Sequence, residues 1–309
     1  MYLQRTIKNE IPCHSIGLHS GRKVNMTLKP AEIDEGIVFV RKDVLGDNRI
    51  KAELQNVSDT TLATTLGLNG TRISTVEHLL SAFRGMGIDN AVVEVDSFEV
   101  PIMDGSARPF VDLLKLSGTK TQNSGRRFLV IKKEIVVSDG EGEAKLVPSP
   151  YFQITYRIDY PHPFIGEQTY HMVFSNLAYE QDICAARTFG FLKDVEYLQA
   201  KGLALGGSLN NAIVLDDEKI INKEGLRCPD ELVKHKILDA IGDLFLIGMP
   251  IIGHFIGYKS GHRLNNSLLK KLMAQEDTWK IVNYLDTDNG IIKMGKNPFH
   301  LNSVAACKA

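Results

Sequence analysis

The stretch "DELVKHKILDAIGDLFLIG" (residues 230–248) has two different faces when it is drawn as a helix. His235, Asp239 and Asp243 are spaced i, i+4 and i+8, so they line one edge. We therefore predict a helix over 229–247 that packs on its apolar side, with Gly242 leaving room for a close neighbour. The apolar side consists of Ile237, Leu238, Ile241, Leu244 and Phe245.

Two interpretations of the polar edge stay open. It can be a solvated charged face. Alternatively, a histidine and an aspartate one turn apart can bind one metal ion together. His235 and Asp239 would supply two ligands of such a site, so a third ligand must come from elsewhere in the chain.

The rest of the chain mixes short strands with helices. The alternating runs "NAVVEVDSF" (90–98) and "FQITYRIDY" (152–160) predict strands, and residues 75–85 predict a further helix. These elements do not follow a regular β-α-β alternation. The pattern therefore indicates an α+β protein built of layered domains.

A polar, glycine-containing segment, "SGTKTQNSGRR" (117–127), follows a helix-like run and precedes a β-branched run. This composition makes it the best candidate for a linker. Because 309 residues are more than one ordinary core holds, we expect two domains, 1–122 and 123–309.

The overall composition excludes several classes of protein. The net charge is −1 and the sequence pI is about 6.8, so no global field favours nucleic acid and an anionic ligand must be held by a local basic group. We expect no nucleic-acid partner, no transmembrane segment and a cytoplasmic location. The cysteines lie too far apart for a disulfide framework or a cysteine-rich zinc site: they are Cys13, Cys184, Cys228 and Cys307.

The stretch "STVEHLL" (74–80) places a carboxylate beside an imidazole at the predicted start of a helix. Ser74 and Glu77 have the spacing of a capping box. Glu77 and His78 lie off the predicted apolar stripe, so a capping glutamate with an exposed neighbour is one interpretation. The other interpretation is that the two residues form one corner of a catalytic site. This pair alone does not decide between the two interpretations. The stripe consists of Val76, Leu79, Leu80 and Phe83.

His262, in "GYKSGHRLNN" (257–266), is expected on a loop near a strand end. A loop histidine is often only solvated, but an imidazole that titrates near neutrality is also the commonest general acid. Six other histidines have no partner at a telling spacing and are interpreted as structural or surface residues: His14, His19, His162, His171, His254 and His300.

Five blocks occur in order along the chain: "ISTVEHLLSAFRGMGIDNAVVEVDSFEVPIMDGSARPFV" (73–111), "AARTFGF" (185–191), "GGSLNNAIV" (206–214), "HKILDAIGDL" (235–244) and "GYKSGHRLNN" (257–266). Together they closely resemble the bacterial UDP-3-O-acyl-N-acetylglucosamine deacetylases. The resemblance implies zinc-dependent hydrolysis of the N-acetyl group of UDP-3-O-(3-hydroxyacyl)-N-acetylglucosamine to acetate and the free amine. This reaction is the committed step of lipid A biosynthesis in Gram-negative bacteria.

The resemblance also implies a fold and a set of catalytic roles. The fold would be two α+β domains, each a two-layer sandwich, with the helices packed between the two sheets. Glu77 would be the general base and His262 the second catalytic group, held in orientation by Asp243. Thr188 would help to bind the oxyanion. One zinc ion, or ferrous iron in vivo, would be bound by His78, His235 and Asp239.

The substrate contacts follow from the same resemblance. Lys236 and Lys259 would meet the nucleotide diphosphate or the sugar, and Lys236 would also belong to the catalytic group. A β-α-β insert at about 189–214 would form a hydrophobic passage for the acyl chain, although these residues can also be simple core residues. The residues in question are Phe189, Phe191, Val195, Ala204, Gly207 and Val214.

A rival hypothesis is a catalytically silent protein on the same fold that binds a UDP-sugar or an acyl ligand. It would need neither a base nor a metal, so the complete set of matching residues argues against it. We expect a monomer whose partner is a small UDP-linked acylated amino sugar.

Overall fold

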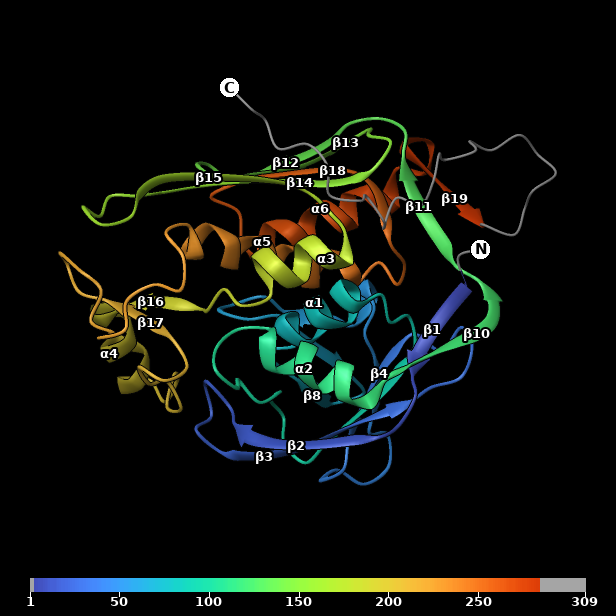
Figure 1. The fold of residues 1–309 in the computed structure, drawn as a ribbon, viewed down its shortest axis with the longest axis horizontal. Helices are drawn as coiled ribbons and strands as arrows, with labels where there is room; N and C mark the ends of the chain where they lie inside the picture. The colour runs from blue at the N-terminus through green and yellow to red at the C-terminus, as the bar shows by residue number, and fades with distance from the viewer. Residues whose placement is uncertain (1–2, 284–309) are drawn as a thin grey trace.

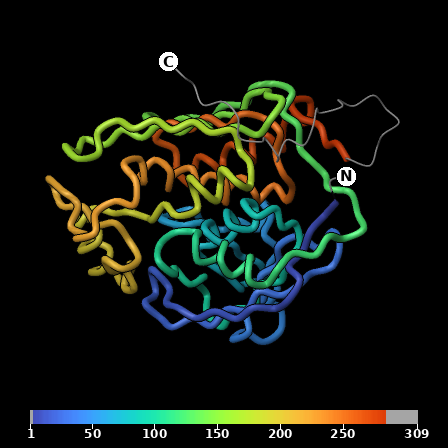
Figure 2. Tube along the Cα trace, in the orientation of Figure 1, coloured from blue at the N-terminus to red at the C-terminus, as the bar shows by residue number. Residues whose placement is uncertain are grey.

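The computed structural model describes residues 3–283 and confirms an α+β fold. Figure 1 shows two sheets, one at each side of the molecule, with helices between them. Figure 2 shows that the blue to cyan part of the chain forms the lower half and that the green segment then rises along one side to the upper sheet. The order of layers is therefore sheet, helices, helices, sheet.

The lower sheet comes entirely from the first hundred residues. Its strand order is β2-β3-β9-β4-β5, and only the β4–β9 pair is parallel. In β3, buried Val24, Met26 and Leu28 alternate with more exposed residues, so one face of the sheet is apolar. Its strands are β2 (Ile11–Ile16), β3 (Lys23–Pro30), β4 (Ile37–Arg41), β5 (Arg49–Lys51) and β9 (Ala91–Val95).

Helices α1 (Glu77–Met86) and α2 (Arg108–Ser117) lie on this first sheet (Figure 1). A small sheet precedes α1 and consists of β6 (Val57–Asp59), β7 (Thr65–Leu68) and β8 (Thr71–Ile73). It brings the chain to the start of α1 from a fixed direction.

The upper sheet has seven strands, with β18 at its centre. Helices α5 (Glu231–Phe245) and α6 (His262–Ala274) cover its inner face. The strands are β11 (Arg127–Ile131), β12 (Ile135–Ser138), β13 (Glu143–Val147), β14 (Phe152–Tyr160), β15 (Gly166–Val173), β18 (Ile251–Tyr258) and β19 (Trp279–Asn283). The short helical turns are η1 (Leu54–Asn56), α3 (Asn176–Ala178), η2 (Tyr179–Ile183) and η3 (Glu276–Thr278).

The strongly periodic predictions are confirmed. The run at 152–160 is β14, the run at 90–98 contains β9, and the predicted helices correspond to α1 and α5. The proposed linker at 117–127 is not an irregular segment, because Thr119–Gly125 forms β10 and pairs with β1 (Leu3–Ile7). A strand in an exposed two-stranded ribbon needs no apolar face, so hydrophobic periodicity does not reveal it. The division into domains at 122/123 stays a prediction.

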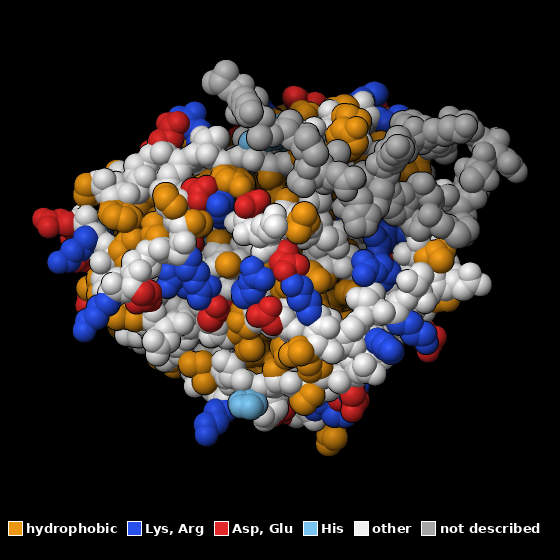
Figure 3. Space-filling model, in the orientation of Figure 1, with side chains coloured by type: hydrophobic (Ala, Val, Ile, Leu, Met, Phe, Trp, Pro, Cys, Tyr) orange, Lys and Arg blue, Asp and Glu red, His pale blue; other side chains and the backbone are white. Residues whose placement is uncertain are grey.

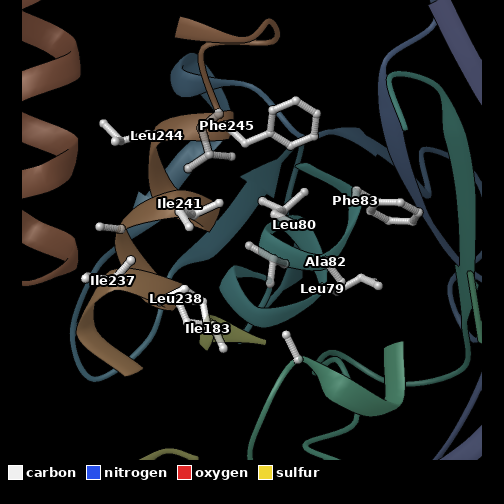
Figure 4. Close-up of a cluster of buried hydrophobic side chains, with 14 of the residues drawn as sticks. Leu79, Leu80, Ala82, Phe83, Ile183, Ile237, Leu238, Ile241, Leu244 and Phe245 are labelled. Carbon is white, nitrogen blue, oxygen red and sulfur yellow. The ribbon is translucent and has the colours of Figure 1, made fainter. Parts of the chain in front are cut away.

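The two halves meet where α1 packs on α5. In Figure 4, Leu80 of α1 lies between the two helices on the side of Ile241 of α5, whereas Phe83 points away from α5 and Ile237 points away from α1. Every residue of α5 except Lys236 is buried. The polar edge of this helix is therefore not a solvated face, and its imidazole and carboxylates lie inside the protein.

A β-α-β insert projects at one side of the molecule (Figure 1). It consists of β16 (Phe189–Phe191), α4 (Leu192–Ala200) and β17 (Ile213–Leu215), and the two strands are parallel. This confirms the predicted secondary structure of the insert. Backbone hydrogen bonds from Leu205 to His19 and from Gly206 to Leu18 tie it to the loop after β2.

Several bulk expectations can be compared with the described residues. Cys13, Cys184 and Cys228 are free thiols, whereas Cys307 and His300 lie outside residues 3–283. Within that range no helix is both long enough and apolar enough to cross a membrane. Basic and acidic side chains are interspersed on the face drawn in Figure 3, so the charge that would hold an anionic substrate must be sought locally.

Candidate metal centre

The three predicted metal ligands meet at the junction of α1 and α5. His78 comes from the first turn of α1, whereas His235 and Asp239 lie one turn apart on α5. The Oδ1 atom of Asp239 is 3.3 Å from Nε2 of His235 and 3.5 Å from Nε2 of His78. One ligand atom from each residue lies within 4.8 Å of the other two, and all three residues are buried.

The protonation of His235 shows that this cluster fits a cation. Its Nδ1 lies 3.0 Å from the carbonyl oxygen of Ala186, which can only accept, so Nδ1 carries the proton and Nε2 is bare. Burial lowers the pKa of His235 to about 4, so the ring is neutral at pH 7. A bare nitrogen and a carboxylate oxygen 3.3 Å apart repel each other unless a cation lies between them. Two imidazole nitrogens and one carboxylate oxygen form the donor set of an open catalytic zinc site.

Asp239 is ionised in this setting. Burial opposes its ionisation, but the pKa of its carboxyl is held well below the usual range, at neutral pH by the Lys236 ammonium because His235 is then neutral. The Lys236 ammonium donates to Oδ2 of Asp239 at 2.9 Å, which leaves Oδ1 directed at the two histidines. Because the carboxylate stabilises the ammonium, the pKa of Lys236 is raised although the partial loss of solvent around it acts in the opposite direction.

Glu77 is buried beside this cluster and does not cap its helix. The first residue of α1 is Glu77 itself, so it cannot reach back as the third residue of a capping box does. The Ser74 hydroxyl oxygen instead accepts a hydrogen bond from Thr65 at 2.8 Å. Thr75, which follows Ser74, has a left-handed φ of 58°, and this bend directs the chain into α1. The interpretation of Glu77 as a capping residue beside an exposed His78 is therefore wrong.

The environment of Glu77 suits a base. Its Oε2 accepts the backbone N–H of Thr64 at 3.1 Å, and its Oε1 lies 3.9 Å from Nε2 of His262. Burial raises the pKa of the Glu77 carboxyl above its ordinary value, although the His262 charge opposes this. A raised pKa brings the carboxylate closer to the basicity that proton abstraction at neutral pH requires.

His262 faces Glu77 from the second half of the chain. It is the first residue of α6, directly after β18 and a short turn, so the expectation that it lies on a loop is wrong. Its Nδ1 lies 2.9 Å from Oδ2 of Asp243. Burial lowers the pKa of His262, but the charge and hydrogen bond of Asp243 outweigh it and raise the pKa to about 9. The ring is therefore an imidazolium at neutral pH.

A cavity of about 160 Å³ opens over these groups. Sequence reasoning missed Leu18, Leu62, Thr75 and Tyr160 among its lining residues, and it set His19 aside. These five residues come from separate segments without a shared period, so no local pattern marks them. The predicted residues that line the cavity are Glu77, His78, Thr188, Phe189, His235, Lys236, Asp239 and His262.

Comparison with known proteins agrees with this geometry. Residues 4–274 match the LpxC family, described as UDP-3-O-acyl N-acetylglycosamine deacetylase. The chain belongs to this deacetylase family. The UDP-3-O-acyl-N-acetylglucosamine deacetylase of Syntrophus aciditrophicus is 58% identical over 308 residues, which cover 100% of this chain and 98% of that protein. The deacetylases of Teredinibacter turnerae and Marinobacter nauticus are each 52% identical, over 92% and 93% of this chain and 94% and 95% of their own lengths.

The two lysines predicted to meet the substrate differ in placement within this deacetylase. Lys236 lines the cavity. Lys259 is not among the lining residues, and its ammonium lies 3.1 Å from Asp159 and 3.4 Å from Glu141. A substrate phosphate would therefore have to compete with two carboxylates for Lys259.

The insert of the deacetylase reaches the cavity through Phe189, whose ring lies 5.8 Å from that of Tyr160. Phe191 also stacks near Tyr160, at a centroid distance of 5.8 Å. The remaining predicted passage residues belong to the body of the insert and do not line the cavity: they are Val195, Ala204, Gly207 and Val214.

Proposed function

We propose that His78, His235 and Asp239 bind one zinc ion and that Glu77 and His262 transfer the protons of amide hydrolysis. The activity itself is deacetylation of UDP-3-O-acyl-N-acetylglucosamine in lipid A biosynthesis. The observation that carries the assignment of roles is the convergence of a metal-binding donor set, a buried carboxylate and an imidazolium on one cavity. A protein that only binds this ligand would need neither the base nor the acid.

The proton transfers follow from the two pKa shifts. A bound zinc ion would polarise the amide carbonyl and lower the pKa of water, which prepares both reactants. Oε1 of Glu77 takes the proton of the attacking water, whose oxygen bonds to the carbonyl carbon. The C–N bond then breaks, and the leaving nitrogen takes its proton from Nε2 of His262. Acetate and the free amine are the products.

The remaining residues bind and orient. Asp243 holds the ring of His262 through Nδ1, so Nε2 points towards Glu77 and the cavity. The Thr188 hydroxyl donates to the developing oxyanion, and its backbone is fixed by hydrogen bonds to Gly105 and Ile213. Lys236 offers a positive charge to the sugar or the diphosphate. The insert takes the acyl chain, with Phe189 at the end nearest the metal ligands. A cytoplasmic location and a monomeric state stay predictions.

Acetate release from UDP-3-O-acyl-N-acetylglucosamine tests the proposal. We expect the zinc-loaded protein to release acetate, and His235→Ala to lose both bound metal and activity. His171→Ala is the matched control, because His171 is exposed on β15 and should change neither. Full activity of His235→Ala, or its loss in both variants, would refute the assigned centre. Ferrous iron loaded in place of zinc tests the identity of the metal.

A further inference from the structure

Thr64 contacts the carboxylates of Glu77 and Asp243 at once. Its backbone N–H donates to Oε2 of Glu77 at 3.1 Å, and its hydroxyl donates to Oδ1 of Asp243 at 2.6 Å. The residue lies directly before β7 and only 1% of it is exposed. We propose that Thr64 is a positioning residue that fixes Glu77 and Asp243 relative to His262. This inference rests on the proposed function, because it assigns a task to the neighbours of the same site.

The two contacts divide the oxygens of each carboxylate. On Asp243, Thr64 occupies Oδ1, while Oδ2 accepts from His262 at 2.9 Å and from Asn265 at 2.8 Å. On Glu77, Thr64 occupies Oε2, while Oε1 lies 3.9 Å from Nε2 of His262. In both cases the oxygen that Thr64 leaves free is the one directed at His262.

This arrangement removes a freedom that carboxylates otherwise keep. The terminal torsion of aspartate and glutamate is broad and roughly two-fold, so the two oxygens can exchange places. A donor on the second oxygen opposes that rotation, and a hydrogen bond to an ionised group is about twice as strong as a neutral one. Catalytic groups lose rate steeply when they are misplaced by even about 1 Å. The Thr64 hydroxyl therefore contributes to turnover without touching the substrate.

Thr64 also joins segments from both halves of the chain. It lies between β6 and β7 of the small sheet that leads into α1, whereas Asp243 lies near the end of α5 and Asn265 lies on α6. One residue therefore ties the base-bearing helix, through its backbone N–H, to the carboxylate that orients the acid, through its hydroxyl. Sequence reasoning could not find this role, because 64 and 243 have no periodic relation.

The neighbouring threonine provides a matched control. Thr65 is also buried on the same segment, and its hydroxyl donates to Ser74 at 2.8 Å, away from Asp243. Thr64→Val and Thr65→Val each remove one buried hydroxyl with little change in shape. A general effect of lost hydroxyls on folding would appear in both variants, whereas a positioning effect appears only in the first.

The experiment compares Thr64→Val, Thr64→Ser, Thr65→Val, Asp243→Asn and the double variant Thr64→Val/Asp243→Asn as full-length, zinc-loaded proteins. We expect Thr64→Val to lower kcat about tenfold with KM and bound zinc unchanged, as the loss of a group that acts on geometry alone predicts. Thr64→Ser should restore kcat to within about twofold, because it keeps the hydroxyl. In the Asp243→Asn background, Thr64→Val should add little further loss.

Three results would overturn the inference: a normal kcat in Thr64→Val, an equal fall in Thr65→Val, or fully additive losses in the double variant. If Thr64→Val does not fold, Thr64→Ala removes the hydroxyl without the second methyl group and is judged by the same outcomes. An unchanged kcat in Asp243→Asn would instead refute the proposed role of Asp243, so the two failures are distinguishable.

Discussion

Gly242 of α5 lies against the backbone of Glu77 on α1 so closely that a Cβ atom on Gly242 would come within 2.0 Å of the Glu77 carbonyl oxygen and 3.1 Å of its Cα. The clash would be with backbone and not with the end of a flexible side chain. The helix that carries two of the proposed metal ligands and the helix that carries the third therefore touch at a glycine.

Gly242→Ala should force α1 and α5 apart and move Glu77 and His78 away from their partners. We expect a loss of about 1–3 kcal/mol in the free energy of unfolding, typical of overpacking in a core, together with weaker metal binding and a fall in kcat. Denaturant unfolding and metal titration measure both effects. Gly190→Ala is the control, because its Cβ would meet only Val195 at an ordinary 3.7 Å. Normal metal affinity in Gly242→Ala would contradict the prediction.

Asp239→Ala should abolish tight metal binding, because it removes the oxygen that both histidine nitrogens face at 3.3 and 3.5 Å. The substitution also leaves the Lys236 ammonium beside the two imidazoles, which adds repulsion to a cation. Metal content after gel filtration is the measurement. Asp277→Ala, at an exposed aspartate, should keep the full content. Near-stoichiometric zinc in Asp239→Ala would remove Asp239 from the ligand set.

His262 should titrate near pH 9 in the metal-free protein, because Asp243 and Glu77 outweigh the effect of burial on its pKa. Because the pKa of His262 is higher in the folded state than its ordinary value, the protonated ring stabilises the fold. This stabilisation is complete below about pH 6.5 and is lost as the pH rises through about 9. NMR titration of the histidine rings measures it. Asp243→Asn should lower the pKa of His262, whereas the pKa of His254, which burial lowers, should not move. A His262 ring that titrates near 6.5 would refute the prediction.

Glu231→Gln should loosen the segment that orients His235. Glu231 forms a buried bidentate ion pair with Arg187, at 2.8 and 3.1 Å. Arg187 lies between Ala186, whose carbonyl oxygen faces Nδ1 of His235, and the cavity residue Thr188. Removing the charge of one partner leaves a buried guanidinium poorly compensated, at a cost of about 3 kcal/mol in stability. Thermal unfolding and metal affinity should both fall. Glu35→Gln removes the charge of an exposed pair with Arg49 and should change neither thermal unfolding nor metal affinity. Equal effects in both variants would contradict a role of the Glu231–Arg187 ion pair in orienting His235.

Gly207→Ser should impair long-chain substrates more than short ones if the insert takes the acyl chain. A Cβ there would lie 3.2 Å from the Ala204 carbonyl oxygen and 3.8 Å from the side chain of Leu18, which lines the cavity. Each methylene that can no longer be buried costs about 0.8 kcal/mol. The ratio of kcat/KM for two acyl lengths is the measurement. Equal loss at all lengths would mean that Gly207 serves only the backbone.

The sequence predicted the elements whose period is long and regular. The two faces of 229–247 and the alternation of 152–160 correspond to α5 and β14. It did not predict β10, because a polar strand in a two-stranded ribbon has no apolar period. It left an exposed His78 open as one alternative, because a stripe drawn on one helix ignores a second layer that covers the other side.

The candidate site was predictable only in part for the same reason. The pair His235 and Asp239 lies one turn apart and can be found by spacing, whereas its partner His78 came from the resemblance to the deacetylases. Thr64, Asn265 and His19 were missed, because their contacts with the site join segments that lie far apart in sequence.

The proposed metal ligands come from both halves of the chain, and this affects how the protein matures. A nascent chain that has been synthesised as far as α4 already contains Thr64, Glu77 and His78, but it has neither His235 nor Asp239. Chains grow at about 5–20 residues per second, so the first half exists for several seconds before α5 can dock. A metal ion held by both helices would act as a cross-link that closes a very long loop, and its entropic benefit would grow with the length of that loop. On the proposed ligand set, metal uptake would report that synthesis and assembly of the two halves are complete.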